Sequence, residues 1–219
     1  MRSWIRSRVP AFHPYDAIRN FPVYPGATTY VYLLSTDNLK KRTGKTMQTW
    51  VAFLRGINVG GKMMVSMKDL AAICTHVGFE NVRTYLNSGN IIFTSPLTEA
   101  KLQQALEKEL SAKIGKEIGV VIRSSGDLEQ IVRDNPFPEA VPSQVGVLLG
   151  VTPVSETVTV QFIITGRERV APGKREVYIH YPDGMGRSKL KIPNSLRDGT
   201  VRNINTLTGL VGLIAKGRG

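Results

Sequence analysis

Apolar positions between residues 47 and 124 follow two periods, one typical of strands and one typical of helices. Two segments with apolar residues three or four positions apart are predicted helices, the first from Ser66 to Gly78 and the second from Thr98 to Gly115. Four short apolar runs around them are predicted strands: 51–54, 81–86, 91–94 and 118–123. This β-α-β-β-α-β order predicts an α+β domain of the ferredoxin-like, split βαβ type, also called the α/β plait.

The second half, residues 125–219, contains the same kinds of element with less regular spacing. A helix is predicted from Ser124 or Ser125 to the stop at Asn135-Pro136, and a last helix covers 205–215. Three further apolar runs are predicted strands: 145–151, 161–165 and 176–181. We interpret this half as a second, smaller and less regular plait in tandem with the first, although no repeat of the sequence itself relates the two.

Residues 1–46 have neither period and are rich in arginine and proline. No uninterrupted apolar region follows the basic start, so a secretory signal is not indicated. Met47 stands directly before the first predicted strand. We therefore expect residues 1–46 to be a loose extension outside the fold, as an over-called start codon would produce, followed by domains at 47–124 and 125–219.

Composition places the chain among ordinary globular proteins, with 219 residues, 42% of them hydrophobic and 21% charged. Cys74 is the one cysteine, so no disulfide can form within the chain, and a reducing, cytoplasmic location is expected. No apolar run approaches the roughly 20 residues of a membrane helix, so no membrane partner is expected.

The net charge of +12 is distributed unevenly along the chain. Residues 1–46 hold eight Lys or Arg against two acids, and residues 167–219 hold eleven against four. Residues 47–166 hold ten against eleven and are therefore close to neutral. A uniformly basic nucleic-acid binder is not indicated by this distribution.

The glycine-rich segment after the first strand contains the first candidate site. Residues 56–62 match the start of a phosphate-binding loop, but Met63 stands where that motif needs Ser or Thr to hold magnesium, which argues against an ATPase or GTPase. A turn that needs glycine only for close backbone approach is one interpretation. The other is an anion or polar-ligand site built from cationic, amide and backbone N–H groups: Arg55, Asn58, Gly60, Gly61 and Lys62.

Two other turns contribute candidates. In the split βαβ arrangement the first and third strands are neighbours, which would bring Ser88 and Asn90 of the 87–90 hairpin turn beside Arg55. The turn at 183–189 offers a phosphate or carboxylate cradle, for which a solvated basic turn is the alternative. Its candidates are Arg187, Ser188 and Lys189, with Tyr181 at the end of the preceding strand.

Four motifs stand in order along the chain, at 54–62, 85–90, 181–190 and 200–203. Together they resemble the bacterial family catalogued as domain of unknown function 1697. The resemblance implies a pair of ferredoxin-like plait domains and no established activity, and it adds Arg202 and Asn203 to the candidate ligand residues. The family usually has an aromatic residue where Ile204 stands, and the stretch after Val151 is short for the family's helix.

The leading functional prediction is the binding of an anionic or nucleotide-like small ligand between the glycine turn and the Arg-Ser-Lys turn. The alternative is an RNA-binding module that uses the sheet face, with Tyr85 and Phe93 as stacking residues, and the basic C-terminal quarter. A purely structural interaction protein is the third interpretation. No catalytic constellation can be assigned, so enzymatic activity and oligomeric state stay open, and no cofactor or metal is expected.

Overall fold

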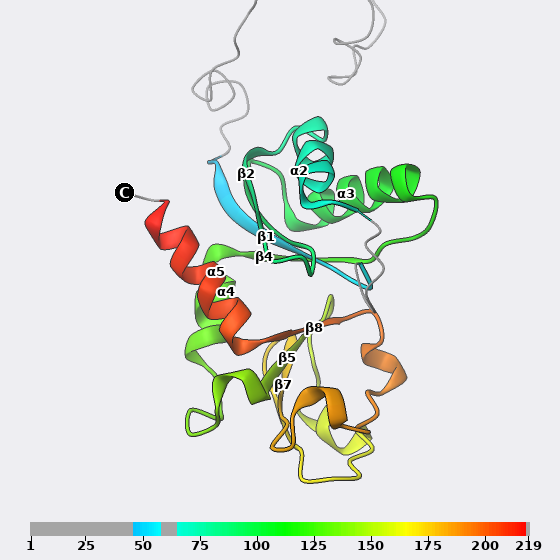
Figure 1. Ribbon diagram of the computed structural model, residues 1–219, viewed down its shortest axis with the longest axis vertical. Coiled ribbons are helices and arrows are strands. Elements are labelled where there is room, and N and C mark those ends of the chain that lie inside the picture. The colour runs from blue at the N-terminus through cyan, green and yellow to red at the C-terminus, as the bar shows by residue number, and fades with distance from the viewer. Residues whose placement is uncertain (1–45, 58–64, 218–219) are drawn as a thin grey trace, which may run out of the picture. The chain divides into compact units, whose positions relative to one another are not determined.

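The computed structural model describes residues 46–57 and 65–217 (Figure 1). The expected extension 1–46 and the candidates Asn58, Gly60, Gly61 and Lys62 therefore lie outside the described residues, apart from Thr46. The first half contains four strands and two helices in the predicted order: β1 (Gln48–Leu54), α2 (Met67–His76), β2 (Glu80–Tyr85), β3 (Asn90–Ser95), α3 (Glu99–Ile114) and β4 (Val120–Ser124).

The helices of this half begin and end where the sequence predicted. The Ser66 hydroxyl accepts a hydrogen bond from the Asp69 N–H at 3.0 Å, which caps the start of α2. Gly115 ends α3 in the left-handed conformation, with a φ of 76°, which glycine adopts without strain. The four strands pair antiparallel in the order β2-β3-β1-β4, so β1 and β3 are neighbours as expected.

The second half forms another four-stranded antiparallel sheet, in the order β6-β7-β5-β8. Its strands are β5 (Val145–Leu149), β6 (Arg169–Pro172), β7 (Glu176–His180) and β8 (Thr200–Asn203). Its helices are α4 (Ser125–Arg133), α5 (Ile204–Lys216) and four 3₁₀ turns: η2 (Pro142–Gln144), η3 (Glu156–Gln161), η4 (Met185–Arg187) and η5 (Asn194–Leu196). The protein is thus a mixed α+β structure with two four-stranded antiparallel sheets.

The predicted strand at 161–165 is wrong. Gln161 ends a 3₁₀ turn, and Ile163 makes only an isolated bridge with Lys191. Of the apolar residues that suggested the strand, Ile163 is 55% and Ile164 is 42% exposed, while Phe162 is buried in the outer core of the second half. Strands β6 and β8 were not predicted, because both are four residues long and carry arginine and proline or asparagine.

The two sheets have the same internal arrangement when each is numbered from its own first strand. Both orders are second-third-first-fourth, and in both the fourth strand runs directly into a helix, α4 or α5. The registers also correspond, because Val51 of β1 pairs with Arg123 while Val147 of β5 pairs with Arg202. The second half therefore repeats the first in strand order and register, with 3₁₀ turns in place of α2 and α3.

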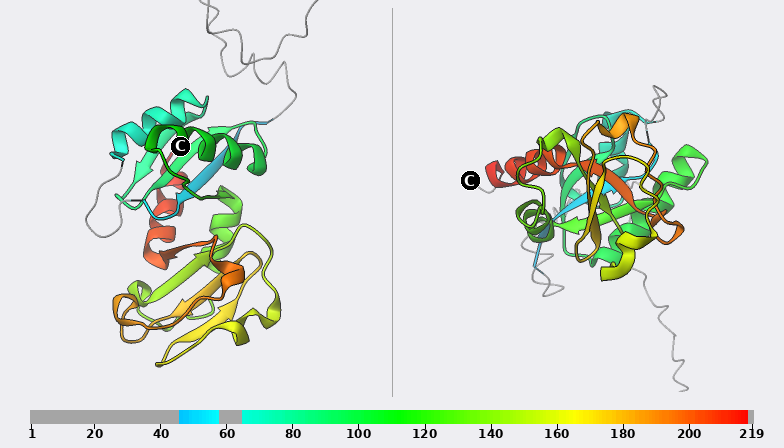
Figure 2. Two further views of the ribbon diagram at one scale, coloured as in Figure 1. Left: turned by 90° about the vertical axis from the view of Figure 1, so that its right-hand side faces the viewer. Right: turned by 90° about the horizontal axis from the view of Figure 1, so that it is seen from below.

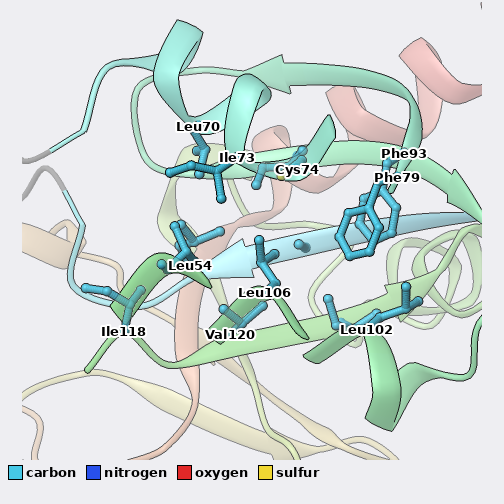
Figure 3. Close-up of a cluster of buried hydrophobic side chains, with 14 of the residues drawn as sticks. Leu54, Leu70, Ile73, Cys74, Phe79, Phe93, Leu102, Leu106, Ile118 and Val120 are labelled. Carbon is cyan, nitrogen blue, oxygen red and sulfur yellow. The ribbon is translucent and has the colours of Figure 1, made fainter. Parts of the chain in front are cut away.

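Three apolar cores fill the described part of the fold. One lies between the first sheet and helices α2 and α3, where Phe79 and Phe93 stack with ring centroids 4.2 Å apart (Figure 3). The central core joins the other face of that sheet to α4, α5 and one face of the second sheet. Helices α4 and α5 pack against each other in this core (Figure 1, Figure 2). The third core covers the outer face of the second sheet beneath the 3₁₀ turns.

Candidate functional site

The described candidate residues fall into three separate places. Arg55 lines a surface hollow, Asn90 and Arg202 are buried together beside the exposed Ser88, and the Arg-Ser-Lys turn lines a second, smaller hollow. The two hollows share no lining residue. The structure does not place these residues around one common cavity.

Arg55 directly follows β1 and is held by three contacts. Its backbone N–H donates to the Gly119 carbonyl at 2.8 Å, and a Cβ on Gly119 would lie 3.2 Å from the Arg55 Nε, so the side chain passes close over this glycine. Its Nη1 donates to the Arg197 carbonyl at 2.5 Å and to the Asp198 carboxylate at 3.3 Å. The guanidinium is thereby positioned while 41% of the side chain stays exposed.

The hollow beside Arg55 has a volume of about 660 Å³ and lies where the two halves meet. Helix α3 and the start of β4 form one side, and residues 151–152 and Asp198 form the other. Its charged groups are two cations and three carboxylates: Arg55, Lys108, Glu107, Glu117 and Asp198. Four uncharged polar side chains complete the polar lining: Gln103, Gln104, Ser111 and Thr152.

Sequence reasoning found Arg55 but missed the other lining residues. On α3 they occupy polar positions that any solvated helix face would show, so nothing in the pattern distinguishes Gln104 or Lys108 from Lys101. Asp198 is 143 residues from Arg55 in sequence. Only the packing of the second half against the first brings these groups together.

Arg202 is buried and uses all of its side-chain donors within the protein. Its Nε donates to Asn90 Oδ1 at 2.6 Å, and its Nη2 donates to the Leu54 and Ser88 carbonyls at 2.8 and 2.9 Å. Its Nη1 donates to the Thr200 hydroxyl and the Val201 carbonyl. These are the five N–H groups that a guanidinium has, so Arg202 joins β8 to the first sheet and has no donor left for a ligand.

Asn90 and Ser88 belong to the same cluster. Asn90 is fully buried, and its amide donates to the Tyr85 carbonyl and the Ser88 hydroxyl, both at 2.9 Å. Asn203 caps α5, since its side-chain oxygen accepts the Thr206 N–H at 2.8 Å. These side chains hold turns and helix starts in place rather than point into a hollow.

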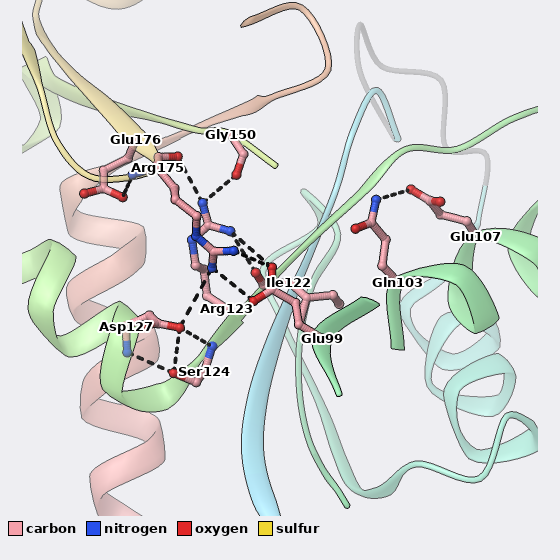
Figure 4. Close-up of polar contacts among 10 residues, drawn as sticks. All are labelled: Glu99, Gln103, Glu107, Ile122, Arg123, Ser124, Asp127, Gly150, Arg175 and Glu176. Carbon is pink, nitrogen blue, oxygen red and sulfur yellow. Dashed lines mark hydrogen bonds and ion pairs between the residues drawn. The ribbon is translucent and has the colours of Figure 1, made fainter. Parts of the chain in front are cut away.

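Arg123 on β4 is the register equivalent of Arg202 and makes the reciprocal connection (Figure 4). Its Nη2 donates to the Gly150 and Arg175 carbonyls of the second half at 2.6 and 3.0 Å. Its Nη1 donates to the carbonyl of the preceding residue, Ile122, as Arg202 does to Val201. In each sheet, therefore, a buried arginine of the last strand donates hydrogen bonds to backbone carbonyls of the other half.

Ionic groups surround Arg123 on the side of α3. Glu99 accepts both Nη groups of Arg175, at 2.7 and 3.0 Å, and lies 4.0 Å from Arg123 (Figure 4). Burial lowers the pKa of Arg123 to about 10, and burial likewise lowers the pKa of Arg202 to about 10. Both guanidinium groups remain cationic at neutral pH.

The Arg-Ser-Lys turn lines a hollow of about 160 Å³ together with Tyr181. The turn residues are exposed or partly exposed, and two carboxylates line the same hollow: Glu168, which accepts the Ser188 hydroxyl, and Asp183, which pairs with Arg167. Tyr181 is buried, and this burial together with the Glu168 charge raises its pKa to about 12. The acidic groups reduce the attraction of this turn for an anion.

The side chains considered for RNA stacking are not presented to solvent as a pair. Phe93 is fully buried in the first core, and Tyr85 packs against the central core. Both faces of the first sheet are covered, one by α2 and α3 and the other by α4 and α5.

Two kinds of feature are absent from the described residues, 46–57 and 65–217. No group of three or more His, Cys, Asp or Glu side chains among them could hold a metal ion. None of the helices in that part of the chain is long and apolar enough to cross a membrane.

Comparisons with known proteins identify a family. Among solved structures, the chain is similar to the conserved bacterial protein SP0830 from Streptococcus pneumoniae, with 25% sequence identity, a TM-score of 0.64, and coverage of 77% of this chain and 99% of that chain. No curated protein matches the chain. The sequence model of the family described as "Protein of unknown function (DUF1697)" matches residues 47–178, so the motifs at 181–190 and 200–203 lie beyond the match. Because this match covers more than half of the chain, the protein belongs to the DUF1697 family, as its motifs predicted.

Proposed function

We propose that this protein binds a small polar ligand with an anionic or nucleotide-like group in the hollow beside Arg55. The observation that carries the proposal is a positioned, partly exposed guanidinium in the wall of a polar hollow of about 660 Å³. A guanidinium binds carboxylate and phosphate groups through parallel hydrogen bonds, which makes Arg55 the anion contact.

The surroundings of Arg55 support this assignment. The volume lies within the roughly 300–1,000 Å³ of small-molecule sites, and such sites are frequent where two structural units meet. Lys108 supplies a second cation, and Gln103 and Gln104 supply amides for the uncharged part of a ligand. The glycine-rich segment 58–62 begins three residues after Arg55 and stays a predicted part of the site.

The Arg-Ser-Lys turn is a weaker candidate than the sequence suggested. Glu168 and Asp183 place two carboxylates in the lining of its hollow, and the volume of about 160 Å³ is too small for a nucleotide-like ligand. We therefore assign the ligand to the larger hollow and leave Arg187 and Lys189 out of the anion contact.

We also propose that each half, 47–124 and 125–219, is a ferredoxin-like plait, the second trimmed to 3₁₀ turns on its outer face. The antiparallel order of both sheets supports this, because it is the order in which split βαβ units pair their strands. A cytoplasmic location fits the reduced, buried Cys74.

A ligand screen tests the proposed function. The thermal midpoint of the protein is measured against nucleotides, sugar phosphates, polyphosphate and small carboxylates, and a stabilising compound is then retested on variants. Arg55→Gln should abolish the shift and Lys108→Gln should reduce it, whereas Lys101→Gln, an exposed lysine of α3 outside the hollow, should retain it.

Two results would contradict the proposal. One is the absence of any stabilising anion. The other is a ligand-induced shift of the thermal midpoint that persists in Arg55→Gln, because the anion would then bind elsewhere. Salt-sensitive binding of generic RNA that persists in Arg55→Gln would favour the alternative function through the basic C-terminal quarter.

A further inference from the structure

The Asp198 carboxylate occupies the position beside Arg55 that a ligand anion would take. Its carboxylate lies 3.3 Å from Arg55 Nη1, and both residues line the same hollow. An anionic ligand that binds Arg55 in this hollow therefore meets a carboxylate that belongs to the protein.

The contact between the two side chains is weak for an ion pair. Charge-assisted N–H···O bonds are about 2.7–2.9 Å long, and the 3.3 Å separation exceeds this range. The Asp198 side chain is 92% exposed, and exposed pairs of this kind contribute little to stability because water screens them. The carboxylate can therefore leave Arg55 at small cost.

The Arg55 guanidinium does not depend on Asp198 for its position. The Arg197 carbonyl accepts its Nη1 at 2.5 Å, and the side chain passes closely over Gly119. The backbone that carries Asp198 is also fixed, because Gly199 lies against the Leu149 carbonyl, where an added Cβ would be only 2.7 Å away. Only the Asp198 side chain needs to move when the pair separates.

The charge balance of the hollow determines whether a second anion can bind beside Asp198 or must replace it. With Asp198 in place, three carboxylates face two cations, which disfavours an additional anion. Glu107 cannot relieve this, because it is held by the Val120 N–H at 2.9 Å and by Gln103 at 3.1 Å. When Asp198 turns to solvent, two cations face two carboxylates, and Arg55 becomes available.

We propose that Asp198 is an internal competitor for the anion site, so that a ligand carboxylate or phosphate binds Arg55 by displacing the Asp198 carboxylate. This inference rests on the proposed function and specifies how the same site selects its ligand. A ligand must offer Arg55 a better-placed anion than Asp198 does, which favours phosphate or a carboxylate with further polar contacts in the hollow. Neutral and cationic compounds cannot replace the Asp198 carboxylate at Arg55, so the displacement does not favour their binding.

The test titrates the full chain with inorganic phosphate and follows the NMR signal of the Arg55 Nε–H group, identified by its absence in Arg55→Gln. Asp198→Asn removes the competing charge and should tighten the apparent Kd for phosphate by about fivefold, since an exposed pair contributes up to about 1 kcal/mol. Asp198→Glu keeps a carboxylate and should bind within about twofold of the unsubstituted chain. Glu156→Gln changes the net charge equally at an exposed site outside the hollow and should leave the Kd unchanged.

The outcomes separate the two proposals. Phosphate binding that requires Arg55 but is unchanged or weaker in Asp198→Asn would overturn the displacement and leave the proposed function standing. An equal increase in phosphate affinity in Asp198→Asn and Glu156→Gln would also overturn it, because net charge rather than competition would then explain the tighter binding. An Arg55 signal that phosphate shifts in none of these proteins would overturn both proposals.

Discussion

Burial of an arginine costs free energy unless every N–H donates to an acceptor, and Arg202 meets this requirement. Its acceptors are backbone carbonyls of β1 and of the β2–β3 turn, the Asn90 side chain, and two groups of its own strand. The Arg-Asn motif at 202–203, a predicted ligand element, thus joins the halves through Arg202 and starts α5 through Asn203. Arg55 differs because it is partly exposed and lies in a hollow.

Replacement of Arg202 by methionine should destabilise the protein by about 3 kcal/mol or more, because the buried Leu54 carbonyl and Asn90 oxygen and the partly buried Ser88 carbonyl lose their donor. Arg197→Met is the control, since the Arg197 side chain is exposed and should cost less than about 0.5 kcal/mol. Urea unfolding measures both. Equal stabilities would show that the donors of Arg202 do not hold the halves together.

Strand-to-helix junctions are the repeated element of this fold. Ser124 follows Arg123 and caps α4 with a full capping box, and Asn203 follows Arg202 and caps α5. In each case one residue of the junction joins the two halves and the next starts a helix of the central core. The sequence predicted the start of α4 from its serines. The same role of Asn203 was not apparent, because asparagine is common in turns, at helix caps and in ligand sites alike.

Loss of a side-chain cap should be measurable at these junctions. Ser124→Ala and Asn203→Ala should each lower the free energy of unfolding by about 1 kcal/mol, because each removes a bond to the third N–H of its helix. Thr98→Ala is the matched control, since Thr98 precedes α3 without a side-chain capping bond and should lose only a few tenths of a kcal/mol. Chemical denaturation compares the three, and a Thr98→Ala loss as large as the others would contradict the role of these bonds.

At the scale of the whole molecule, the central core makes the two sheets depend on each other. It contains Val51 and Phe53 of β1, Val147 of β5, and the inward faces of α4 and α5. The predicted boundary near residue 124 separates two sheets in sequence but passes through the junction between β4 and α4. The described part of the chain should therefore unfold as one cooperative unit even though it has two sheets.

Leu207→Ala tests this cooperativity. Leu207 is fully buried on α5, and its truncation should cost about 2–5 kcal/mol. Hydrogen exchange should then speed up in β1 as much as in β5, because both strands border the same core. Leu102→Ala, in the outer core of the first half, should affect both sheets likewise if unfolding is global. Protection that is lost in β5 alone would instead show that the halves unfold independently.

Local chemistry made most of the first half predictable. Four strands, two helices, the Ser66 cap and the end of α3 at Gly115 follow from the apolar period and from serine and glycine at the helix ends, all of which act within a few residues. The second half was harder because its outer segments are 3₁₀ turns and its new strands are four residues long. The exposed residues Ile163 and Ile164 suggested a strand, since composition alone does not reveal whether an apolar residue is buried.

By itself the sequence determined the family, the α+β class and the position of Arg55 after the first strand, because each depends on motifs or on neighbouring residues. Tertiary structure alone decided that the second sheet repeats the first, that Arg123 and Arg202 connect the halves reciprocally, and that Asp198 faces Arg55. These features depend on contacts between groups far apart in the chain. Such contacts leave no local period in the sequence, and the same arginine can therefore hold a fold together or bind a ligand until its neighbours are known.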